Sequence, residues 1–272
     1  MTDFNKIKNY YKMFDEKNRL KNDNSGKLEY YMTMSILKEY LPKNAKILDL
    51  GGGAGAYSFP LARDAYEVYL ADLSEELINQ AISQKNEEKL DNIISCDVVN
   101  AVDLSCYSDN QFDVVLLFGP LYHLLDESER TKCVKETNRV LKEGGIIFAS
   151  FIPYLSGSIA IIDRYFRHPE QVNVDNLNEV FNSERFNNDS EKGFQEGYYP
   201  RSKEIEELFS QNGFKKKLIR SIRGIGYEKE DNIYEIKDKE MFNKIIELIS
   251  KTSSEESIIE MCGHAIYVGE KK

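Results

Sequence analysis

A glycine-rich turn with an acidic side chain in front of it is the clearest chemical feature of the sequence. In KILDLGGGAGAYS, residues 46–58, Asp49 lies near the end of a short apolar run, and Gly51, Gly53 and Gly55 follow at two-residue spacing. Glycine bends tightly and lets a bound molecule approach the main chain. In a doubly wound sheet, the turn after the first strand faces the ligand crevice. The stretch therefore predicts a site for an adenosine-containing cofactor.

Two cofactors fit this turn. Gly51, Gly53 and Ala56 satisfy G-x-G-x-x-A, the dinucleotide fingerprint, while Asp49 and the glycines also satisfy D-x-G-x-G-x-G. A carboxylate beside the turn repels a pyrophosphate and suits a ligand with a cationic amine. S-adenosylmethionine carries such an amine and a sulfonium, and it has no phosphate. Asp49 therefore favours S-adenosylmethionine over NAD.

A second carboxylate follows at the end of the next predicted strand. Asp72 lies 23 residues after Asp49, directly before the sequence LSEEL. An acid at this place can accept both ribose hydroxyls of an adenosine ligand. It can also serve as a favourable charge at the beginning of the next helix. Both interpretations of Asp72 stay open at this point.

Methyl transfer from a sulfonium depends mainly on positioning and desolvation, and a hydroxyl or protonated amine acceptor also needs a base. The candidate base is His123 in GPLYHLL, at the carboxyl end of the predicted fourth strand. Its neighbour Tyr122 is a candidate for the wall of the acceptor pocket. The competing interpretation packs both side chains at the start of the next helix. His264 in the last strand and His168 are expected to be structural and surface residues.

Strands and helices alternate between residues 46 and 151. Apolar runs predict strands at 46–50, 67–71, 92–96, 112–118 and 145–151, with helical segments between them. Near-continuous apolar strands indicate a parallel sheet covered on both faces. With later strands at 214–222 and at the C-terminus, we expect an α/β, doubly wound, Rossmann-like sheet of seven strands, mostly parallel with an antiparallel last strand.

Four segments are predicted around this sheet. Residues 1–41 form an N-terminal helical segment and lid, and residues 42–151 form the cofactor-binding core. Residues 152–200, aromatic and then rich in asparagine, are too long for a plain connection and predict a lid or cap. Residues 201–272 complete the sheet and carry a helical insert at 227–258.

Composition narrows the possible partners. The chain has 272 residues, 36 basic against 46 acidic, and a net charge of -10, which is a poor match for nucleic acid. No apolar run is long enough for a membrane span, and the polar first twenty residues do not resemble a signal peptide. The four cysteines lack metal-binding spacing, so no metal site is expected. We expect a cytoplasmic protein, and the sequence leaves its oligomeric state open.

Five blocks in order give the sequence a family resemblance. It resembles the class I S-adenosylmethionine-dependent methyltransferases, including a bacterial subgroup with small-molecule or unassigned substrates. ILDLGGGAG is similar to their first motif, ADLS to the second-strand acid and CDV to the third strand. FDVVLLFGPLYHL and RVLKEGGIIFASF are similar to the fourth and fifth blocks. The likeness is strong over about residues 28–151 and looser elsewhere.

The resemblance implies roles for individual residues. Asp49 and the three glycines would surround the methionine moiety, Asp72 would hold the ribose and Leu73 would pack on the adenine. Asp97 would accept the adenine amino group with Val98 beside it, while the carbonyl of Phe118 would face the methionine amine. Arg19 would meet the cofactor carboxylate from the N-terminal segment.

The resulting hypothesis is an enzyme that transfers a methyl group from S-adenosylmethionine to a small molecule and releases S-adenosylhomocysteine. Three alternatives remain: a methyltransferase for protein or RNA, an NAD-dependent oxidoreductase, and a non-catalytic module that binds S-adenosylmethionine. The acceptor atom stays open, because the same fold serves many chemistries.

Overall fold

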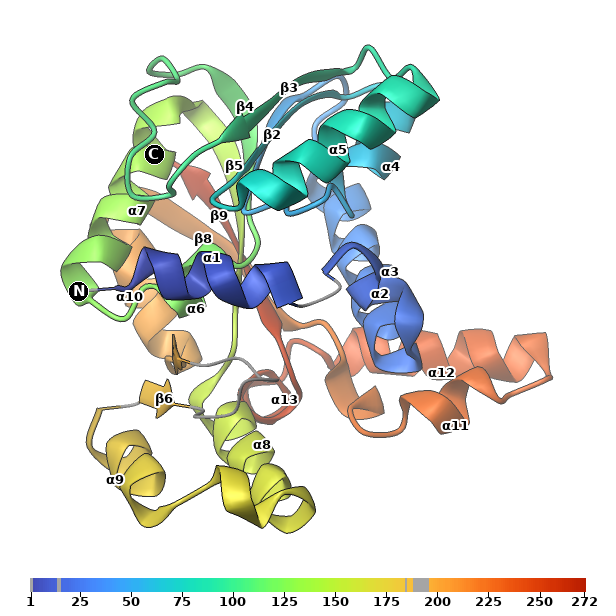
Figure 1. Ribbon diagram of the computed structural model, residues 1–272. Helices are drawn as coiled ribbons and strands as arrows, with labels where there is room; N and C mark the ends of the chain where they lie inside the picture. The colour runs from blue at the N-terminus through green and yellow to red at the C-terminus, as the bar shows by residue number, and fades with distance from the viewer. Residues whose placement is uncertain (1, 14–15, 184, 188–195) are drawn as a thin grey trace.

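A seven-stranded sheet forms the centre of the molecule (Figure 1). The computed structural model describes residues 2–13, 16–183, 185–187 and 196–272. The strand order is β3-β2-β1-β4-β5-β9-β8, and β9 alone runs in the direction opposite to the other six strands of this sheet. This confirms the predicted fold class. The strands are β1 (Lys46–Leu50), β2 (Glu67–Asp72), β3 (Ile93–Val98), β4 (Phe112–Leu117), β5 (Leu141–Phe151), β8 (Phe214–Ser221) and β9 (Ala265–Lys271).

Helices cover both faces of the sheet, because successive residues of a strand point to opposite sides. In β4, Val114 and Leu116 join one buried cluster, and Val115 and Leu117 join the other. The first cluster takes side chains from α3 (Asn24–Tyr40), α4 (Ser58–Arg63), α5 (Glu75–Glu88) and α12 (Lys239–Thr252). The second takes side chains from α7 (Glu127–Val140), α10 (Ser202–Gln211) and α13 (Glu256–Met261). The near-continuous apolar runs of the sequence thus fill two cores.

The N-terminal elements lie over the carboxyl ends of the parallel strands. Figure 1 shows α1 (Phe4–Met13) running across the front of the molecule, followed by η1 (Glu16–Asn18) and α2 (Arg19–Asn22). Phe4, Ile7, Lys8 and Tyr11 share one face of α1, since their spacing follows the helical repeat. That face covers the edge of the sheet at which ligands bind in this architecture.

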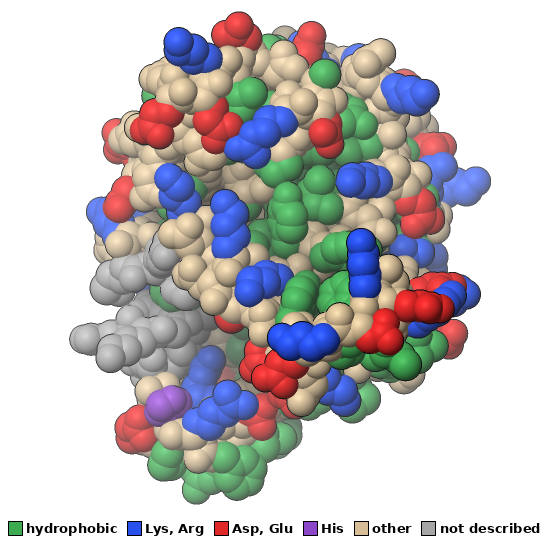
Figure 2. Space-filling view, turned by 90° about the vertical axis from the view of Figure 1, so that its right-hand side faces the viewer, with side chains coloured by type: hydrophobic (Ala, Val, Ile, Leu, Met, Phe, Trp, Pro, Cys, Tyr) green, Lys and Arg blue, Asp and Glu red, His purple; other side chains and the backbone are tan. Residues whose placement is uncertain are grey.

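A lobe outside the sheet contains α8 (Tyr154–Arg167), η2 (Pro169–Gln171), α9 (Val174–Ser183), β6 (Arg185–Asn187) and β7 (Glu196–Tyr198). A small core of its own includes Ile161, Val180 and Phe186. In Figures 1 and 2 the lobe projects at the bottom, and Figure 2 shows apolar side chains at its tip. A salt bridge of 2.6 Å from Lys6 to Glu196 connects the lobe to α1.

The remaining elements are α6 (Pro120–His123), η3 (Gly224–Gly226) and α11 (Glu230–Tyr234). No helix within the described ranges combines the length and the apolar character needed to cross a bilayer.

Candidate functional site

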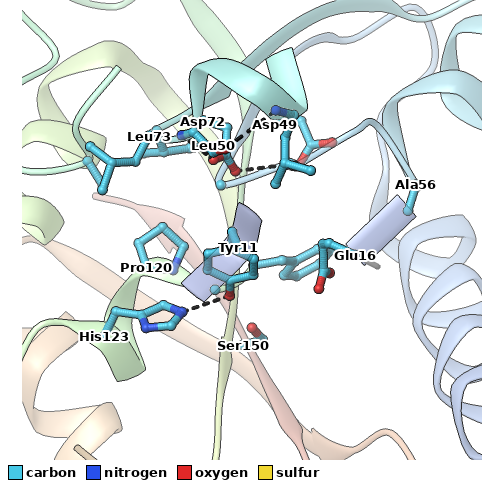
Figure 3. A pocket seen from close by; sticks show the side chains of 18 of the residues that line it. Tyr11, Glu16, Asp49, Leu50, Ala56, Asp72, Leu73, Pro120, His123 and Ser150 are labelled. Atoms are coloured by element: carbon cyan, nitrogen blue, oxygen red, sulfur yellow. Dashed lines mark hydrogen bonds between the residues drawn. The ribbon is translucent and has the colours of Figure 1, made fainter. Parts of the chain in front are cut away.

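A cavity opens at the carboxyl edge of the sheet, under α1 (Figure 3). Its walls come from the glycine turn after β1, the end of β2, α6, and the beginning of β9. The helical face of α1 defined above closes it from outside. Among the described residues, none from 152–200 lines this cavity. The part of the predicted lid that contributes to its walls is therefore the N-terminal segment.

Asp49 is the most deeply buried acid of the cavity, with no exposed surface. Its Oδ2 accepts a hydrogen bond of 2.6 Å from Ser58 Oγ, while its Oδ1 has no hydrogen-bond partner among the described residues. Burial raises the pKa of Asp49 to about 6, and the nearby charge of Asp72 adds to this against the opposing Ser58 hydrogen bond. An acceptor atom in this state suits a bound cation that can donate to it.

The glycines of the turn are required by backbone geometry. Gly51, Gly53 and Gly55 have φ of 80°, 56° and 92°, a region that side chains disfavour. A Cβ on Gly51 would come within 2.6 Å of the Pro120 ring, so a side chain there would collide with α6. The Gly51 N–H donates to the Ala71 carbonyl at 2.8 Å and ties the turn to β2.

Asp72 faces the same turn from the end of β2. Its carboxylate accepts one backbone hydrogen bond from Gly53 and one from Ser74, each of 2.8 Å. Burial raises the pKa of Asp72, and these hydrogen bonds oppose that effect. Each carboxylate oxygen keeps a further lone pair for a ligand donor. Leu73, the next residue, also lines the cavity.

The segment after β3 differs in detail from the expected arrangement. Asp97 accepts hydrogen bonds from Ser95 Oγ at 2.6 Å and from the Tyr107 hydroxyl at 2.9 Å. Val98 is 51% exposed on the outer surface. The cavity wall here consists of Val99, Asn100 and Ala101 instead. The adenine contacts assigned to Asp97 and Val98 stay predictions, and residues 99–101 are nearer candidates.

An ion-pair cluster occupies the other end of the cavity. Arg19 lies 3.0 Å from Glu16 through Nε and 2.9 Å from Glu29 through a terminal nitrogen. The second oxygen of Glu29 lies 3.0 Å from His264 Nδ1. Burial alone would raise the pKa of Glu29, but Arg19 and His264 together hold it far below its ordinary value. Arg19 thus lines the cavity as predicted, with two carboxylates already around it.

His264, which was expected to be a structural residue of the last strand, also lines the cavity. Sequence reasoning located it by its distance along the chain from the glycine turn. The predicted antiparallel direction of the last strand could have placed His264 at the cavity, because the start of β9 lies at the same edge of the sheet as the ends of β1, β2 and β4. The cavity therefore contains a histidine that sequence reasoning missed.

His123 and Tyr122 both line the cavity from α6. His123 Nε2 lies 2.8 Å from the Tyr11 hydroxyl, which joins α1 to α6 (Figure 3). Burial lowers the pKa of His123 to about 3, so the ring is neutral at physiological pH. Tyr122 lies between two histidine rings, 4.9 Å from His123 and 5.9 Å from His264 between centroids. The base role of His123 stays a prediction, and its occupied nitrogen makes it a weaker candidate.

Negative charge predominates around this cavity. Within the described part of the chain, its charged lining side chains are Glu16, Glu29, Asp49 and Asp72 against Lys8 and Arg19. No group of three His, Cys, Asp or Glu side chains in that part is arranged to hold a metal ion. The arrangement suits a cationic organic ligand that lies across the glycine turn.

Comparison with known proteins agrees with the fold. Residues 48–149 match the family model described as a methyltransferase domain. A SAM-dependent methyltransferase structure from Methanosarcina mazei superimposes with a TM-score of 0.59 at 20% identity, covering 87% of this chain and 96% of that one. Residues 48–149 are thus similar to a methyltransferase domain, and the fold of the chain is that of a solved S-adenosylmethionine-dependent methyltransferase.

Curated relatives match the same region. The chain is 35% identical over 105 residues to a ubiquinone biosynthesis O-methyltransferase of Caulobacter vibrioides, which is 38% of this chain and 39% of the relative. It is 34% identical over 111 residues to a ubiquinone/menaquinone biosynthesis C-methyltransferase of Haemophilus ducreyi, with the same coverage of 38% and 39%. The matched region thus spans less than half the length of these relatives.

Proposed function

We propose that this protein is an enzyme that transfers a methyl group from S-adenosylmethionine to a small-molecule acceptor and releases S-adenosylhomocysteine. The observation that carries the proposal is the unpartnered, fully buried Oδ1 of Asp49 beside the glycine turn. A buried acceptor without a donor is costly, and the ammonium of the cofactor would remove that cost. The family of the core domain supports the same cofactor.

The other lining residues fit this cofactor. Asp72 has lone pairs left for ribose hydroxyls, and Leu73 offers an apolar contact for the adenine. Phe118 and the glycine turn lie next to Asp49 in the lining, where the methionine part would extend. Arg19 would bind the cofactor carboxylate, in exchange for part of its pairing with Glu16. When bound, the cofactor supplies an electrophilic methyl group on sulfur.

The charge of the cavity argues against NAD. A pyrophosphate carries two negative charges, and it would be placed near the carboxylates of Asp49 and Asp72. S-adenosylmethionine brings two positive charges and one negative charge to the same place. The acidic lining therefore favours the methyl donor over the dinucleotide.

The acceptor side of the cavity favours a small molecule. The α1 helix covers the opening with Phe4, Ile7 and Tyr11, so a macromolecule could present only a narrow group to it. The face in Figure 2 mixes Lys and Arg with Asp and Glu, and it has no continuous basic surface for RNA. The two relatives methylate oxygen and carbon by name, so they leave the acceptor atom of this chain open.

Two measurements test the proposal. Calorimetry should detect binding of S-adenosylhomocysteine and no binding of NAD. Methyl-labelled cofactor, incubated with the protein and a cell extract, should then label the small-molecule fraction rather than the protein or RNA fractions. Tight NAD binding without binding of S-adenosylhomocysteine would overturn the cofactor assignment. Cofactor binding without transfer to any fraction would leave a non-catalytic binding module.

A further inference from the structure

We propose that His264, oriented by Glu29, is the general base that takes a proton from the methyl acceptor. This inference rests on the proposed function, because it concerns the acceptor end of the same cavity. Neither residue belongs to the glycine-turn motifs by which the domain is recognised. Glu29 lies in α3 and His264 directly before β9, 235 residues apart in the chain.

The contact between the two side chains defines the proton position on the imidazole. Glu29 is only 6% exposed and its carboxylate is ionised, because Arg19 at 2.9 Å and His264 hold its pKa far below the ordinary value. An ionised carboxylate can only accept hydrogen bonds. The His264 Nδ1 atom, 3.0 Å from it, must therefore carry the proton. In the neutral ring this leaves Nε2 with a free lone pair.

The His264 side chain reaches the cavity. His264 lines the cavity and its side chain is 26% exposed. Its Nε2 has no hydrogen-bond partner among the described residues. The Tyr122 ring lies parallel to the imidazole, at 5.9 Å and an angle of 5°. The hydrogen bond to Glu29 and the parallel Tyr122 ring thus both favour one orientation of His264.

The two histidines of the cavity differ in what their Nε2 atoms contact. His123 Nε2 is engaged by the Tyr11 hydroxyl at 2.8 Å, so a substrate would first have to displace α1. His264 Nε2 has no hydrogen bond to α1 that a substrate would have to replace. Arg19 connects Glu29 to Glu16, and Arg223, which pairs with Glu230, lies against Gly263 directly before His264. The Glu29 carboxylate lies 3.0 Å from His264 Nδ1 and orients the ring.

The step balances as follows. A lone pair on the acceptor atom forms the bond to the methyl carbon, and the carbon–sulfur bond breaks with its electron pair remaining on sulfur. The proton on the acceptor atom moves to His264 Nε2. The resulting imidazolium is bound to the Glu29 carboxylate through Nδ1–H, and solvent takes the proton afterwards. The inference therefore commits to an acceptor with an ionisable O–H or N–H.

The first test measures the tautomer on the protein alone. The chain contains three histidines, so nitrogen-15 imidazole NMR can assign each ring by substitution. At a pH where the rings are neutral, His264 should be the Nδ1–H tautomer, and Glu29→Gln should abolish that preference. An Nε2–H tautomer in the unsubstituted protein would overturn the proposal without reference to activity.

The second test uses His264→Asn, because the carboxamide N–H can still donate to Glu29 while no basic nitrogen remains. Transfer of labelled methyl to the small-molecule fraction should fall by about 10²–10⁴-fold, as for loss of a general base. Affinity for S-adenosylhomocysteine should be unchanged. The matched control is His168→Asn in the exposed lobe, which should keep full activity.

The outcomes separate this inference from the proposed function. Full transfer by His264→Asn overturns the base role alone, and the enzyme assignment stands. Lost affinity for S-adenosylhomocysteine in that variant would make His264 part of the cofactor site instead. Absence of transfer by the unsubstituted protein overturns the proposed function and the base role together.

Discussion

Asp49 should make the stability of the ligand-free protein decrease as the pH rises. Burial raises its pKa from an ordinary value of 3.8 to about 6, so the folded state disfavours the charged form. Below the unfolded pKa the carboxyl is neutral in both states and costs nothing. The penalty grows as the pH rises from the unfolded to the folded pKa, and it is constant above about 6. Stability is therefore lost in this window.

The size of the effect follows from the shift of the pKa. At about 1.4 kcal/mol per pKa unit, the shift corresponds to a penalty of about 3 kcal/mol when it is complete. About 2 kcal/mol of this should develop between about pH 4.5 and about pH 7.5. Asp49→Asn removes the ionisation and with it the pH-dependent part. The buried carboxamide of this variant changes the free energy of unfolding by an amount that does not depend on pH.

The assay is urea denaturation of the protein and of Asp49→Asn over this pH range. The difference between the two free energies of unfolding cancels the titration of all other groups. Ser58→Ala should steepen the dependence, because the Ser58 hydroxyl stabilises the ionised form at 2.6 Å. A difference that stays flat with pH would refute the assignment of a buried, titrating Asp49.

The same group predicts a pH dependence of ligand binding. The ammonium of S-adenosylhomocysteine favours ionised Asp49, so affinity should increase as the pH rises towards and above about 6. Calorimetry on Asp49→Asn should show weaker binding without this dependence. Equal affinity and equal pH dependence in the two proteins would place the ligand amine elsewhere.

Three further predictions concern other contacts of the site. Asp72→Ala should weaken S-adenosylhomocysteine by about 2–4 kcal/mol without unfolding the protein, because charged hydrogen bonds to the ribose are lost; unchanged affinity by calorimetry would reduce Asp72 to a helix-terminal charge. Gly51→Ala should lower the free energy of unfolding by about 2–4 kcal/mol, because residue 51 has a φ of 80° and a Cβ there would approach Pro120. A decrease below about 1 kcal/mol in urea denaturation, close to that of an ordinary surface substitution, would argue against this geometry. Tyr11→Phe removes the hydrogen bond to His123, which should lower the free energy of opening of α1 by roughly 1 kcal/mol. Backbone amide hydrogen exchange in α1 should become faster by the corresponding factor. Unchanged exchange in 4–13 would show that this bond does not hold the helix.

Local pattern was sufficient to predict the fold, and it placed the glycine turn and two carboxylates that the structure brings together in one cavity. The strand at 46–50, the positive φ of the glycines and the carboxylates at 49 and 72 follow from residue types and short spacings. The reason is that the strand, the turn and the start of the helix are each determined by the residue types within a stretch of about ten residues. Leu73 and Phe118 were assigned through the family resemblance; both line the cavity, and their contacts with a cofactor stay predictions.

Other assignments depended on details that the pattern leaves open. Whether Asp97 or Asn100 faces the cavity depends on where β3 ends relative to β2, and the chain continues two residues further before it turns to the site. The division of the chain at 151 and 200 stays a prediction. The helical face of α1 was readable from its spacing, but its position over the strand ends was not.

The sequence by itself determined at which edge of the sheet the glycine turn and the carboxylates of Asp49 and Asp72 lie. Only the tertiary structure decided which side chains complete the far end of the cavity. The last strand inserts beside β5 in the opposite direction, so its first residues arrive at the ligand edge. This brings His264 to within 3.0 Å of Glu29. No local pattern encodes this contact, because the two residues come from opposite ends of the chain and meet only when the helices have packed on both faces of the sheet.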